Sequence, residues 1–401
     1  MEKRGLKILN INDTCTGCGA CMSACAKGAL SMEYNEEGFY YPKLNPDLCI
    51  DCHFCEKSCH VINKPIKEEI NRDFIPYMLK AKDDDLVKNS SSGGIFSLMA
   101  NEILSKGGIV YGARYNFDKE RLEQCSTDEC SLDELRKSKY IESYLGDTFA
   151  CLRKQLLSGR HVLFCGTPCQ IKGLLTYLET RKTTTEKLIT VRFICHGVPA
   201  NKFFTEYKHW KEKKVGARIT SLDFRPKTRG WKTSNIVLRF GNGKSTDDLH
   251  KEDYYYGYYY SKPNLLLRTC CYDCKQLHES VGDFTIADFW GIRMYDPSNK
   301  DNKGISLALV HTEKAKEMLG AISKHSQVEE LPQSAVDYIY KDAPYKKTLL
   351  EKRASMMHEA IKIGYMPHAI KTLRGRIIKE KIKNYFKSIL KKSGIWEIIR
   401  K

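Results

Sequence analysis

The sequence predicts an α+β protein that consists of a cysteine-rich module, a mixed α/β domain and a helical C-terminal extension. Three observations predict this fold: a repeated run of cysteines before residue 60, alternating strand and helix patterns in the middle of the chain, and a basic amphipathic segment at its end. The chain has 401 residues, 42% of them hydrophobic, which suffices for several packed cores and excludes a disordered protein. The expected units are a module over 1–62, a linker with prolines and mixed charges over 63–80, two parts of the α/β domain over 81–158 and 159–330, and a basic helical extension over 331–401.

Eight of the 17 cysteines lie in two runs, and each position of the first run recurs 34 residues later. The first run is Cys15, Cys18, Cys21 and Cys25, and the second is Cys49, Cys52, Cys55 and Cys59. This spacing resembles that of two-cluster bacterial ferredoxins, in which the fourth cysteine of each run binds the other cluster. We therefore expect one [4Fe-4S] cluster on Cys15, Cys18, Cys21 and Cys59, and a second on Cys49, Cys52, Cys55 and Cys25. Paired zinc sites are the alternative, but they usually use cysteine pairs separated by a longer loop.

A serine-glycine loop at residues 90–94 precedes a helical pattern that ends at Gly107, and a strand is expected from Ile109 to Ala113. Ser91 or Ser92 is expected to cap the helix. Backbone N–H groups and hydroxyls at a helix N-terminus favour phosphate binding. An ordinary cap and turn is the alternative interpretation.

Two strand-turn-helix patterns place a cysteine after a buried strand. Residues 162–164 are followed by Thr167 as N-cap and Pro168 in the first turn of a helix, which puts Cys169 where the helix dipole favours a thiolate with a lowered pKa. Residues 190–194 form the second strand, which leads into Cys195. Ligands bind at the carboxyl ends of parallel strands, so these two cysteines are expected to converge if the strands are neighbours.

Cys271 and Cys274 add two thiols at ligand spacing and complete a set of four with Cys169 and Cys195. Cys270 competes with Cys271 in register, and buried structural thiols are the alternative for any member of the set. The remaining cysteines at 125, 130 and 151 have no partner pattern and are expected to be structural. The tyrosine-rich run 254–260 suits either stacking on a flavin or base, or a packed aromatic element; we favour the second.

Several motifs, in order along most of the chain, resemble the coenzyme F420 hydrogenase/dehydrogenase beta-subunit family. They are Ser91 to Gly94, Lys139 to Ile141, Gly166 to Gln170, Cys195 to Pro199, Phe224 with Arg225, Gly230 with Trp231, Cys271 with Cys274, and Asp283 to Gly291. The resemblance implies a flavin and iron-sulfur domain that holds FAD and a third [4Fe-4S] cluster. It implies cluster ligation by Cys169, Cys195, Cys271 and Cys274, and flavin contacts from Ser92, Gly93, Gly94, Thr167, Gln170 and Asp288.

The function implied by this resemblance is that of an oxidoreductase that passes electrons between [4Fe-4S] clusters and FAD. Ferredoxin, reduced F420 and NAD(P)H are the implied external donors or acceptors. Similar proteins fused to a ferredoxin module occur beside enzymes of surface-polysaccharide biosynthesis, where a reductase is expected. The alternative is a non-catalytic, ferredoxin-like relay subunit of a larger complex.

The net charge of +17 is concentrated at the C-terminal end of the chain. Residues 371–401 hold eleven Lys and Arg against two Glu, which is +9 of the total. Apolar residues lie between these charges, as in helices that dock on a membrane surface or on a partner protein; a solvated terminal helix is the alternative. A nucleic-acid-binding protein with structural clusters is not expected, because no known nucleic-acid-binding motif accompanies the positive charge. The sequence starts without an apolar leader, so we expect a cytoplasmic protein, peripheral to the inner face of the membrane through this segment.

Overall fold

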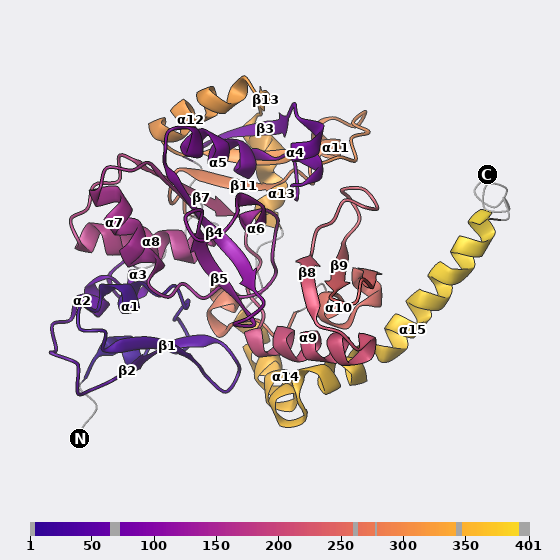
Figure 1. Ribbon diagram of the computed structural model, residues 1–401, viewed down its shortest axis with the longest axis horizontal. Coiled ribbons are helices and arrows are strands. Elements are labelled where there is room, and N and C mark those ends of the chain that lie inside the picture. Colours follow the sequence, from indigo (N-terminus) through magenta and orange to yellow (C-terminus); the bar gives the residue numbers. More distant parts are fainter. Residues whose placement is uncertain (1–4, 65–72, 260–263, 277–278, 342–346, 393–401) are drawn as a thin grey trace.

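The computed structural model describes residues 5–64, 73–259, 264–276, 279–341 and 347–392, and its centre is an eight-stranded mixed sheet (Figure 1). The strand order is β13-β3-β12-β11-β7-β6-β4-β5. The strands are β3 (Ile75–Ala81), β4 (Ile109–Asn116), β5 (Arg121–Ser126), β6 (Val162–Gly166), β7 (Leu188–Phe193), β11 (Phe284–Asp288), β12 (Ser306–Val310) and β13 (Ser326–Glu330). Neighbouring pairs among β11, β7, β6 and β4 are parallel, which confirms the predicted partly parallel sheet.

Helices cover both faces of this sheet because successive strand residues point to opposite sides. Leu163 and Ile189 pack under α5 (Ile95–Ser105) and α12 (Glu313–Ser323). The alternate residues Val162 and Leu188 pack under α7 (Thr148–Leu157) and α8 (Pro168–Thr180). Short helices α4 (Asp84–Lys88), α6 (Leu132–Leu135) and α11 (Ile292–Tyr295) lie in the connections.

The N-terminal module packs against α8 rather than standing apart as an independent unit. Its hairpin joins β1 (Leu30–Tyr34) to β2 (Tyr40–Leu44), and its helices are α1 (Ala20–Ala24), α2 (Phe54–Lys57) and α3 (His60–Asn63). Ala20 and Ala24 are fully buried in the same hydrophobic cluster as Ile171 and Leu174 of α8. The module and the α/β domain therefore share part of one core.

A second, three-stranded sheet with the order β10-β9-β8 lies beside the main domain. Its strands are β8 (Ile219–Asp223), β9 (Asn235–Phe240) and β10 (Ser245–Leu249), and α9 (Asn201–Val215) and α10 (Tyr254–Tyr259) pack with them. Tyr255, Tyr256 and Tyr258 are buried in this cluster, so the tyrosine run forms a packed aromatic element as favoured from the sequence. Tyr260 lies outside the described residues.

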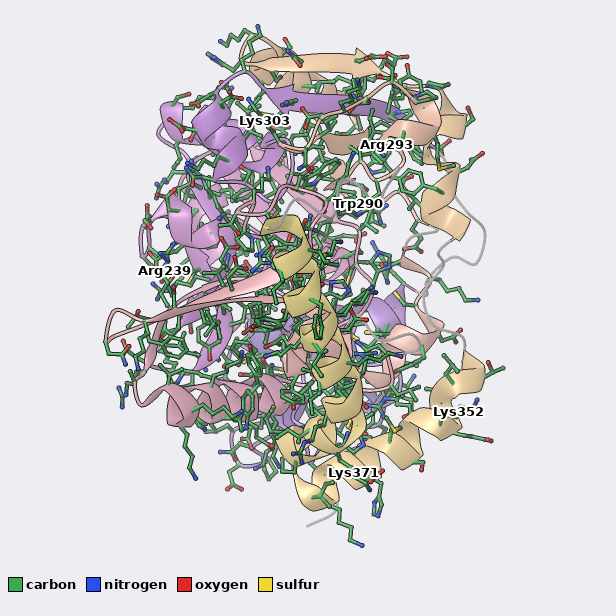
Figure 2. All side chains as sticks on the ribbon, turned by 90° about the vertical axis from the view of Figure 1, so that its right-hand side faces the viewer. Arg239, Trp290, Arg293, Lys303, Lys352 and Lys371 are labelled. Atoms are coloured by element: carbon green, nitrogen blue, oxygen red, sulfur yellow. The ribbon has the colours of Figure 1, made fainter. Side chains whose placement is uncertain are left out.

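The C-terminal extension is helical, as predicted, with α13 (Asp337–Lys341), α14 (Leu350–Ile363) and α15 (Tyr365–Lys392). The first half of α15 is anchored through Tyr365, Leu373 and Ile377, and its second half projects away from the body (Figure 1). In Figure 2 the helix runs across the side that faces the viewer, with Lys371 near its anchored end. No helix within the described part of the chain is long and apolar enough to cross a membrane.

Two local expectations were wrong. Residues 75–80, assigned to the linker, belong to β3, which pairs with β12 and β13; the rest of the predicted linker at 65–72 lies outside the described residues. Pro76 and Lys80 obscure the strand pattern, but a proline is tolerated near the start of a strand. The N-cap of α5 is Gly94 in a left-handed conformation, not Ser91 or Ser92.

Candidate functional site

The first group of thiols is formed by the cysteines expected to share one cluster. Cys15, Cys18 and Cys59 all lie close enough to Cys21 to raise its pKa through their charges, in addition to a larger effect of burial. Burial raises the pKa of Cys18 to about 12. The backbone N–H of Gly17 donates a hydrogen bond to the Cys15 sulfur, as backbone amides do around an iron-sulfur cluster.

The second group lies on the outer side of the module, where Cys25, Cys49, Cys52 and Cys55 line one cavity. The Cys25 sulfur accepts a hydrogen bond from the backbone N–H of Ala29 at 3.2 Å. Burial raises the pKa of Cys55 to about 11, whereas Cys52 is exposed. Cys25 of the first run therefore lies beside three cysteines of the second run, and Cys59 of the second run lies close to Cys21 of the first.

The third group gathers Cys169, Cys195, Cys271 and Cys274 from four separate places in the sequence. Cys169 opens α8 beyond β6, Cys195 follows β7, and the other two belong to the turn at Thr269–Asp273 and its end. Because β6 and β7 are adjacent and parallel, their carboxyl ends bring the first two cysteines together. Burial raises the pKa of Cys195 to about 11 and that of Cys274 to about 12.

The expectation of a low pKa at Cys169 was wrong. Burial holds the pKa of this thiol well above its usual value, and the neighbouring Cys195 raises it further. The hydrogen bond between Cys169 and Thr167, at 3.1 Å, acts in the opposite direction but is weaker. Loss of hydration in the interior outweighs the favourable end of the helix.

Cys270 is a fifth thiol at the third group, so the register of the ligands stays open. It interacts with Cys271 and also with Cys15 of the first group. A hydrogen bond from Cys271 lowers the pKa of Cys270 most strongly, and the guanidinium of Arg268 lowers it further. This residue therefore lies between the first and third groups.

The donor sets fit [4Fe-4S] clusters by their chemistry. Buried thiols with raised pKa values stay protonated at neutral pH unless a cationic centre displaces their protons, as iron does. Each set consists of sulfur alone, with backbone N–H groups directed at several of the sulfurs. Within the described part of the chain, the buried amide of Gln276, two residues after Cys274, has no hydrogen-bond partner and is a further polar group beside the third set.

Helix α8 connects the third group to the first. Cys169 lies in its first turn, and Gly173 follows one turn later on the same face. A β-carbon added at Gly173 would lie 2.7 Å from the Cys18 sulfur. Only a residue without a side chain lets the first group approach the helix so closely.

A buried arginine joins the same two groups. Arg268 is fully buried and donates to the Cys15 carbonyl at 2.7 Å, to Glu142 at 2.7 Å and to the Tyr40 carbonyl at 2.8 Å. It thus fixes the first cysteine loop and the hairpin of the module to the turn that carries Cys271. The sequence alone did not single out Arg268 or Glu142.

The residues proposed as flavin contacts lie at the same carboxyl edge of the sheet. The serine-glycine loop follows α4, beyond the end of β3, with Ser92 donating to the Ile305 carbonyl and the Gly93 N–H donating to the Ser306 hydroxyl. Thr167 and Gln170 form the capping box of α8. The last of the proposed contacts, Asp288, ends β11.

Asp288 belongs to a polar and aromatic cluster that the sequence indicated only in part. Its carboxylate accepts from Arg225 at 3.0 Å and from the Trp231 indole at 2.7 Å. Trp231 stacks on Trp290 with ring centroids 4.8 Å apart, and Trp290 lies near the surface in Figure 2. The family motifs at 224–225, 230–231 and 283–291 therefore meet in space.

Two partly buried lysines, Lys139 and Lys227, place positive charge beside this edge. Burial lowers the pKa of Lys139 to about 8 and that of Lys227 to about 8. Lys227 donates to the carbonyl of Ser92, and Lys139 interacts with Asp223 and Cys165. A bound anion would stabilise the protonated form of both lysines. The chemistry at this edge therefore fits a phosphate-bearing cofactor such as FAD.

Comparison with known families agrees with both resemblances. Residues 14–62 match the family model of the 4Fe-4S dicluster domain, and residues 159–335 match that of the C terminus of the coenzyme F420 hydrogenase/dehydrogenase beta subunit. The chain therefore carries a segment similar to a dicluster ferredoxin domain, followed by a segment similar to the C terminus of the F420 hydrogenase/dehydrogenase beta subunit. It is thus an iron-sulfur electron-transfer protein related to those beta subunits.

The chain is similar at low identity to two curated proteins and to one solved structure. One subunit of the F420H2 dehydrogenase of Methanosarcina mazei is 24% identical over 189 residues, which are 45% of this chain and 52% of that protein. An archaeal-type NADPH glutamate synthase of Dehalococcoides mccartyi is 26% identical over 141 residues, 34% of this chain and 25% of that one. The chain therefore spans about half the length of the first relative and a quarter of the second. A chain of the F420-reducing [NiFe] hydrogenase complex from Methanosarcina barkeri is 17% identical, with a TM-score of 0.44 over 74% of this chain and 94% of that chain.

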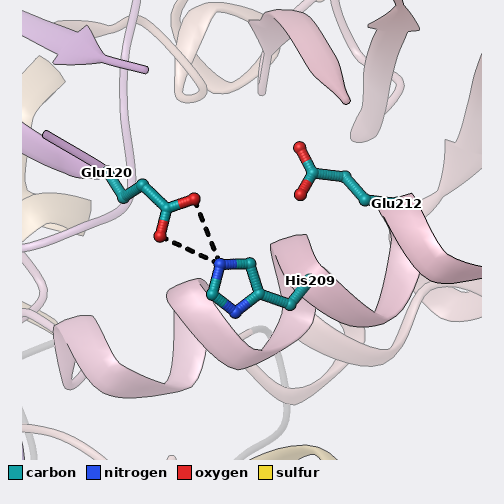
Figure 3. Close-up of side chains that lie close together, drawn as sticks. All are labelled: Glu120, His209 and Glu212. Carbon is teal, nitrogen blue, oxygen red and sulfur yellow. Dashed lines mark hydrogen bonds and ion pairs between the residues drawn. The ribbon is translucent and has the colours of Figure 1, made fainter. Parts of the chain in front are cut away.

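A group of possible metal ligands outside the three cysteine groups is already filled by a lysine. Glu120, His209 and Glu212 offer ligand atoms within 4.8 Å of one another (Figure 3). The buried ammonium of Lys208 lies 2.7 Å from Glu120 and 2.9 Å from Glu212, where a cation would sit. The arrangement is a salt-bridge network between α9 and the turn that joins β4 to β5.

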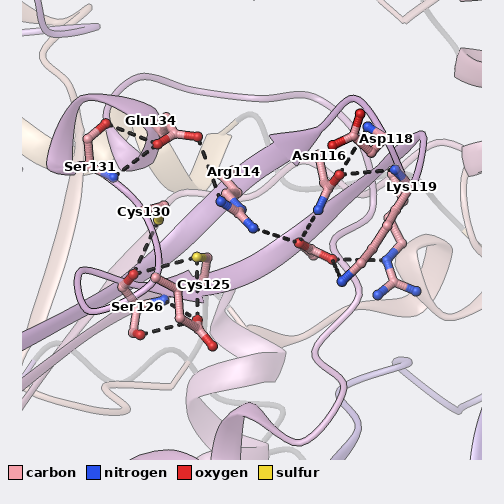
Figure 4. Close-up of polar contacts among 12 residues, drawn as sticks. Arg114, Asn116, Asp118, Lys119, Cys125, Ser126, Cys130, Ser131 and Glu134 are labelled. Carbon is pink, nitrogen blue, oxygen red and sulfur yellow. Dashed lines mark hydrogen bonds and ion pairs between the residues drawn. The ribbon is translucent and has the colours of Figure 1, made fainter.

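The cysteines expected to be structural stay apart from the three groups. Cys125 lies near the end of β5 and Cys130 in the connection after it, and both sulfurs lie within 3.5 Å of the Ser126 carbonyl (Figure 4). Cys151 on α7 lies 3.4 Å from the Asp147 carboxylate. None of these contacts involves a proposed cluster ligand.

Proposed function

We propose that this protein is an iron-sulfur flavoprotein oxidoreductase that passes single electrons between an external carrier and FAD. The observation that carries the proposal is the gathering of Cys169, Cys195, Cys271 and Cys274 at the carboxyl edge of the sheet, one helical turn from the contact between Gly173 and Cys18. The two cysteine groups of the module and the third group, beside the proposed flavin contacts, would therefore form a path for electrons from the module to the flavin.

The proposed ligands are those expected from the sequence. Cys15, Cys18, Cys21 and Cys59 hold the first cluster, Cys25, Cys49, Cys52 and Cys55 the second, and Cys169, Cys195, Cys271 and Cys274 the third. When bound, the clusters carry electrons one at a time, and a flavin exchanges a two-electron hydride for single electrons.

The FAD site is proposed at the carboxyl ends of β3, β6 and β11. The loop of Ser92, Gly93 and Gly94 lies beside the ammonium of Lys227, which places positive charge near the proposed pyrophosphate. Thr167 and Gln170 lie in the turn from β6 into α8. Their side chains cap this helix, and the Thr167 hydroxyl lies 3.1 Å from the Cys169 sulfur. Asp288 holds Arg225 and Trp231 in place beside the same edge.

A second candidate function is that of a ferredoxin-like relay subunit of a larger complex. The name of the Methanosarcina mazei relative, a dehydrogenase subunit, favours it. Reduced F420, NAD(P)H and ferredoxin are the donors to test for the oxidoreductase. An intermediate of surface-polysaccharide biosynthesis is the substrate class that we propose from the resemblance.

Anaerobic purification with iron, sulfide, zinc and flavin counted per chain distinguishes these functions. About twelve iron atoms with one FAD support the oxidoreductase, because three cubanes hold four irons each. About twelve iron atoms without flavin favour the relay subunit. Zinc in place of iron, or iron for fewer than two clusters, contradicts both.

We also propose that the projecting half of α15 docks on an anionic membrane surface. Its exposed apolar residues recur at helical spacing along one side, and basic residues flank them. The apolar stripe is Ile378, Ile382, Tyr385, Phe386 and Ile389, and the flanking residues are Lys379, Lys381, Lys383 and Lys387. The predicted basic residues Arg400 and Lys401 lie outside the described residues.

A further inference from the structure

The two cysteine loops of the module have the same backbone but different residues at equivalent positions. Gly17 has a φ of 69° in the first loop, and Asp51, which stands 34 residues later, has a φ of 60°. Likewise Gly19 has a φ of 70°, and its equivalent His53 has a φ of 57°. Glycine adopts this left-handed conformation without strain, whereas Asp and His do so at a cost.

The first loop needs its glycines because the rest of the chain packs directly on it. A β-carbon at Gly17 would lie 2.9 Å from both Arg268 and Glu142, and one at Gly19 would lie 3.2 Å from Leu145. This loop therefore faces the third cysteine group across a closed interface.

The second loop presents side chains to solvent at the equivalent positions. Ile50 is 61% exposed, and Cys52, Asp51 and His53 are exposed as well. Phe54 is exposed, whereas its equivalent in the first loop is fully buried. Three exposed apolar side chains, Leu48, Ile50 and Phe54, thus lie around the exposed Cys52. We call these three residues the second-loop face. It lies next to α2, at the outer edge of the molecule in Figure 1.

We propose that the second-loop face is the docking site for an external one-electron carrier protein. The inference rests on the proposed function, in which the second cysteine group holds a cluster. Internal symmetry supports it: in the first repeat the same loop positions contact a second redox domain, and in the second repeat they are exposed for a redox partner from outside the chain. The reduced carrier would lose one electron, and a [4Fe-4S] cluster held by the second cysteine group would gain it, with no bond or proton exchanged.

The chemistry of the face indicates what kind of partner fits. Charged residues around it are balanced in number, and the guanidinium of Arg181 lies over the Phe54 ring; they are Asp47, Asp51 and Glu56 against Lys27, Lys57 and Arg181. The three apolar side chains therefore provide the contact, and steering by net charge is weak. Such small faces are typical of transient electron-transfer encounters, which bury less than about 1,200 Å². We expect a carrier with a neutral, apolar contact surface and a reaction with little dependence on salt.

The test uses the full-length, cluster-loaded protein and a reduced two-cluster bacterial ferredoxin as the probe. Stopped-flow absorbance follows the bleaching of the iron-sulfur bands in the wild type, Ile50→Asp and Leu48→Asp. We expect both substitutions to lower the second-order rate constant by about tenfold or more, since a buried charge at a contact costs over about 1.4 kcal/mol. Leu157→Asp, at an equally exposed leucine on α7, is the matched control and should react like the wild type.

Reduced methyl viologen, which needs no protein contact, separates this inference from the proposed function. The docking site is supported if viologen bleaches every variant at the wild-type rate while ferredoxin reduces Ile50→Asp and Leu48→Asp more slowly than the wild type. Equal rates with ferredoxin in all four proteins overturn the docking proposal. A wild type that is reduced by viologen but not by ferredoxin overturns it as well. A loss with both reductants also counts against docking. A wild type without iron or viologen-dependent bleaching instead overturns the proposed function.

Discussion

Arg268 and Glu142 form a buried ion pair, with a guanidinium nitrogen 2.7 Å from a carboxylate oxygen, at the junction of the N-terminal module and the α/β domain. Burial raises the pKa of Glu142, which the charge of Arg268 partly offsets. Glu142 also accepts from the backbone N–H of Tyr40 and the Asn201 amide, both at 3.3 Å. The pair is thus the polar centre of an otherwise apolar contact.

Removing one partner of this pair should destabilise the protein strongly. Arg268→Gln leaves the Glu142 carboxylate buried without its countercharge, a loss of about 3–5 kcal/mol. The double variant with Glu142→Gln should recover much of that loss, because two neutral amides can hydrogen-bond to each other. The free energy of unfolding, or the thermal midpoint if unfolding is irreversible, measures both.

The exposed pair of Lys43 and Glu33 is the control for this experiment. Lys43→Gln should cost less than about 1 kcal/mol, since exposed ion pairs contribute little. If the double variant is as unstable as Arg268→Gln, the two residues do not act as a pair.

A side chain at Gly173 should disturb the contact between α8 and the first cysteine group. Gly173→Val forces the Cys18 sulfur away from the helix, because even one added carbon would approach it to 2.7 Å. We expect loss of about one cluster's iron, four atoms per chain, or a changed electron paramagnetic resonance signal of that cluster. Gly320→Val, on the open side of α12, is a matched helix control. An unchanged signal in Gly173→Val would show that the helix does not contact the loop as described.

The affinity for FAD should fall as the pH rises through 8. Lys139 and Lys227, with pKa values of about 8, are charged below that pH and attract the pyrophosphate; above it they become neutral. Each lysine that binds FAD only in its protonated form lowers the affinity by up to tenfold per pH unit above its pKa. Quenching of flavin fluorescence by apoprotein between pH 6.5 and 9.5 measures the trend.

Lys227→Gln should weaken FAD binding below pH 8 and flatten this pH dependence. Lys303→Gln, at an exposed position labelled in Figure 2, should leave both unchanged. An affinity that is constant over this pH range, or that rises with pH, would argue against a pyrophosphate beside these lysines.

Vesicle flotation should show binding through α15. Wild-type protein should float with vesicles of phosphatidylserine and phosphatidylcholine but not with phosphatidylcholine alone, because each lysine near an anionic surface contributes about 1 kcal/mol. Salt at about 0.5 M screens these charges and should weaken the binding. Ile382→Ser with Phe386→Ser should abolish flotation, whereas Leu157→Ser should not. Equal flotation of the stripe variant and the wild type would remove the membrane proposal.

Local patterns predicted much of this structure, and long-range contacts account for what they missed. Thr167 and Pro168 start α8 as expected, since a capping box is encoded within four residues. Arg268 and Glu142 are 126 residues apart, and nothing near either of them indicates a partner. The pKa of Cys169 depends on burial by the rest of the fold, which a local helix pattern does not describe. The clustering of Asp288 with Arg225 likewise required the tertiary structure.

The central claim is that a third [4Fe-4S] cluster stands on Cys169, Cys195, Cys271 and Cys274. Iron and sulfide counted per chain after anaerobic reconstitution, in the wild type and in Cys195→Ser, test it most directly. We predict about twelve iron atoms in the wild type and about eight in the variant, with the two clusters of the module still visible by electron paramagnetic resonance. About eight iron atoms in both proteins would contradict the claim.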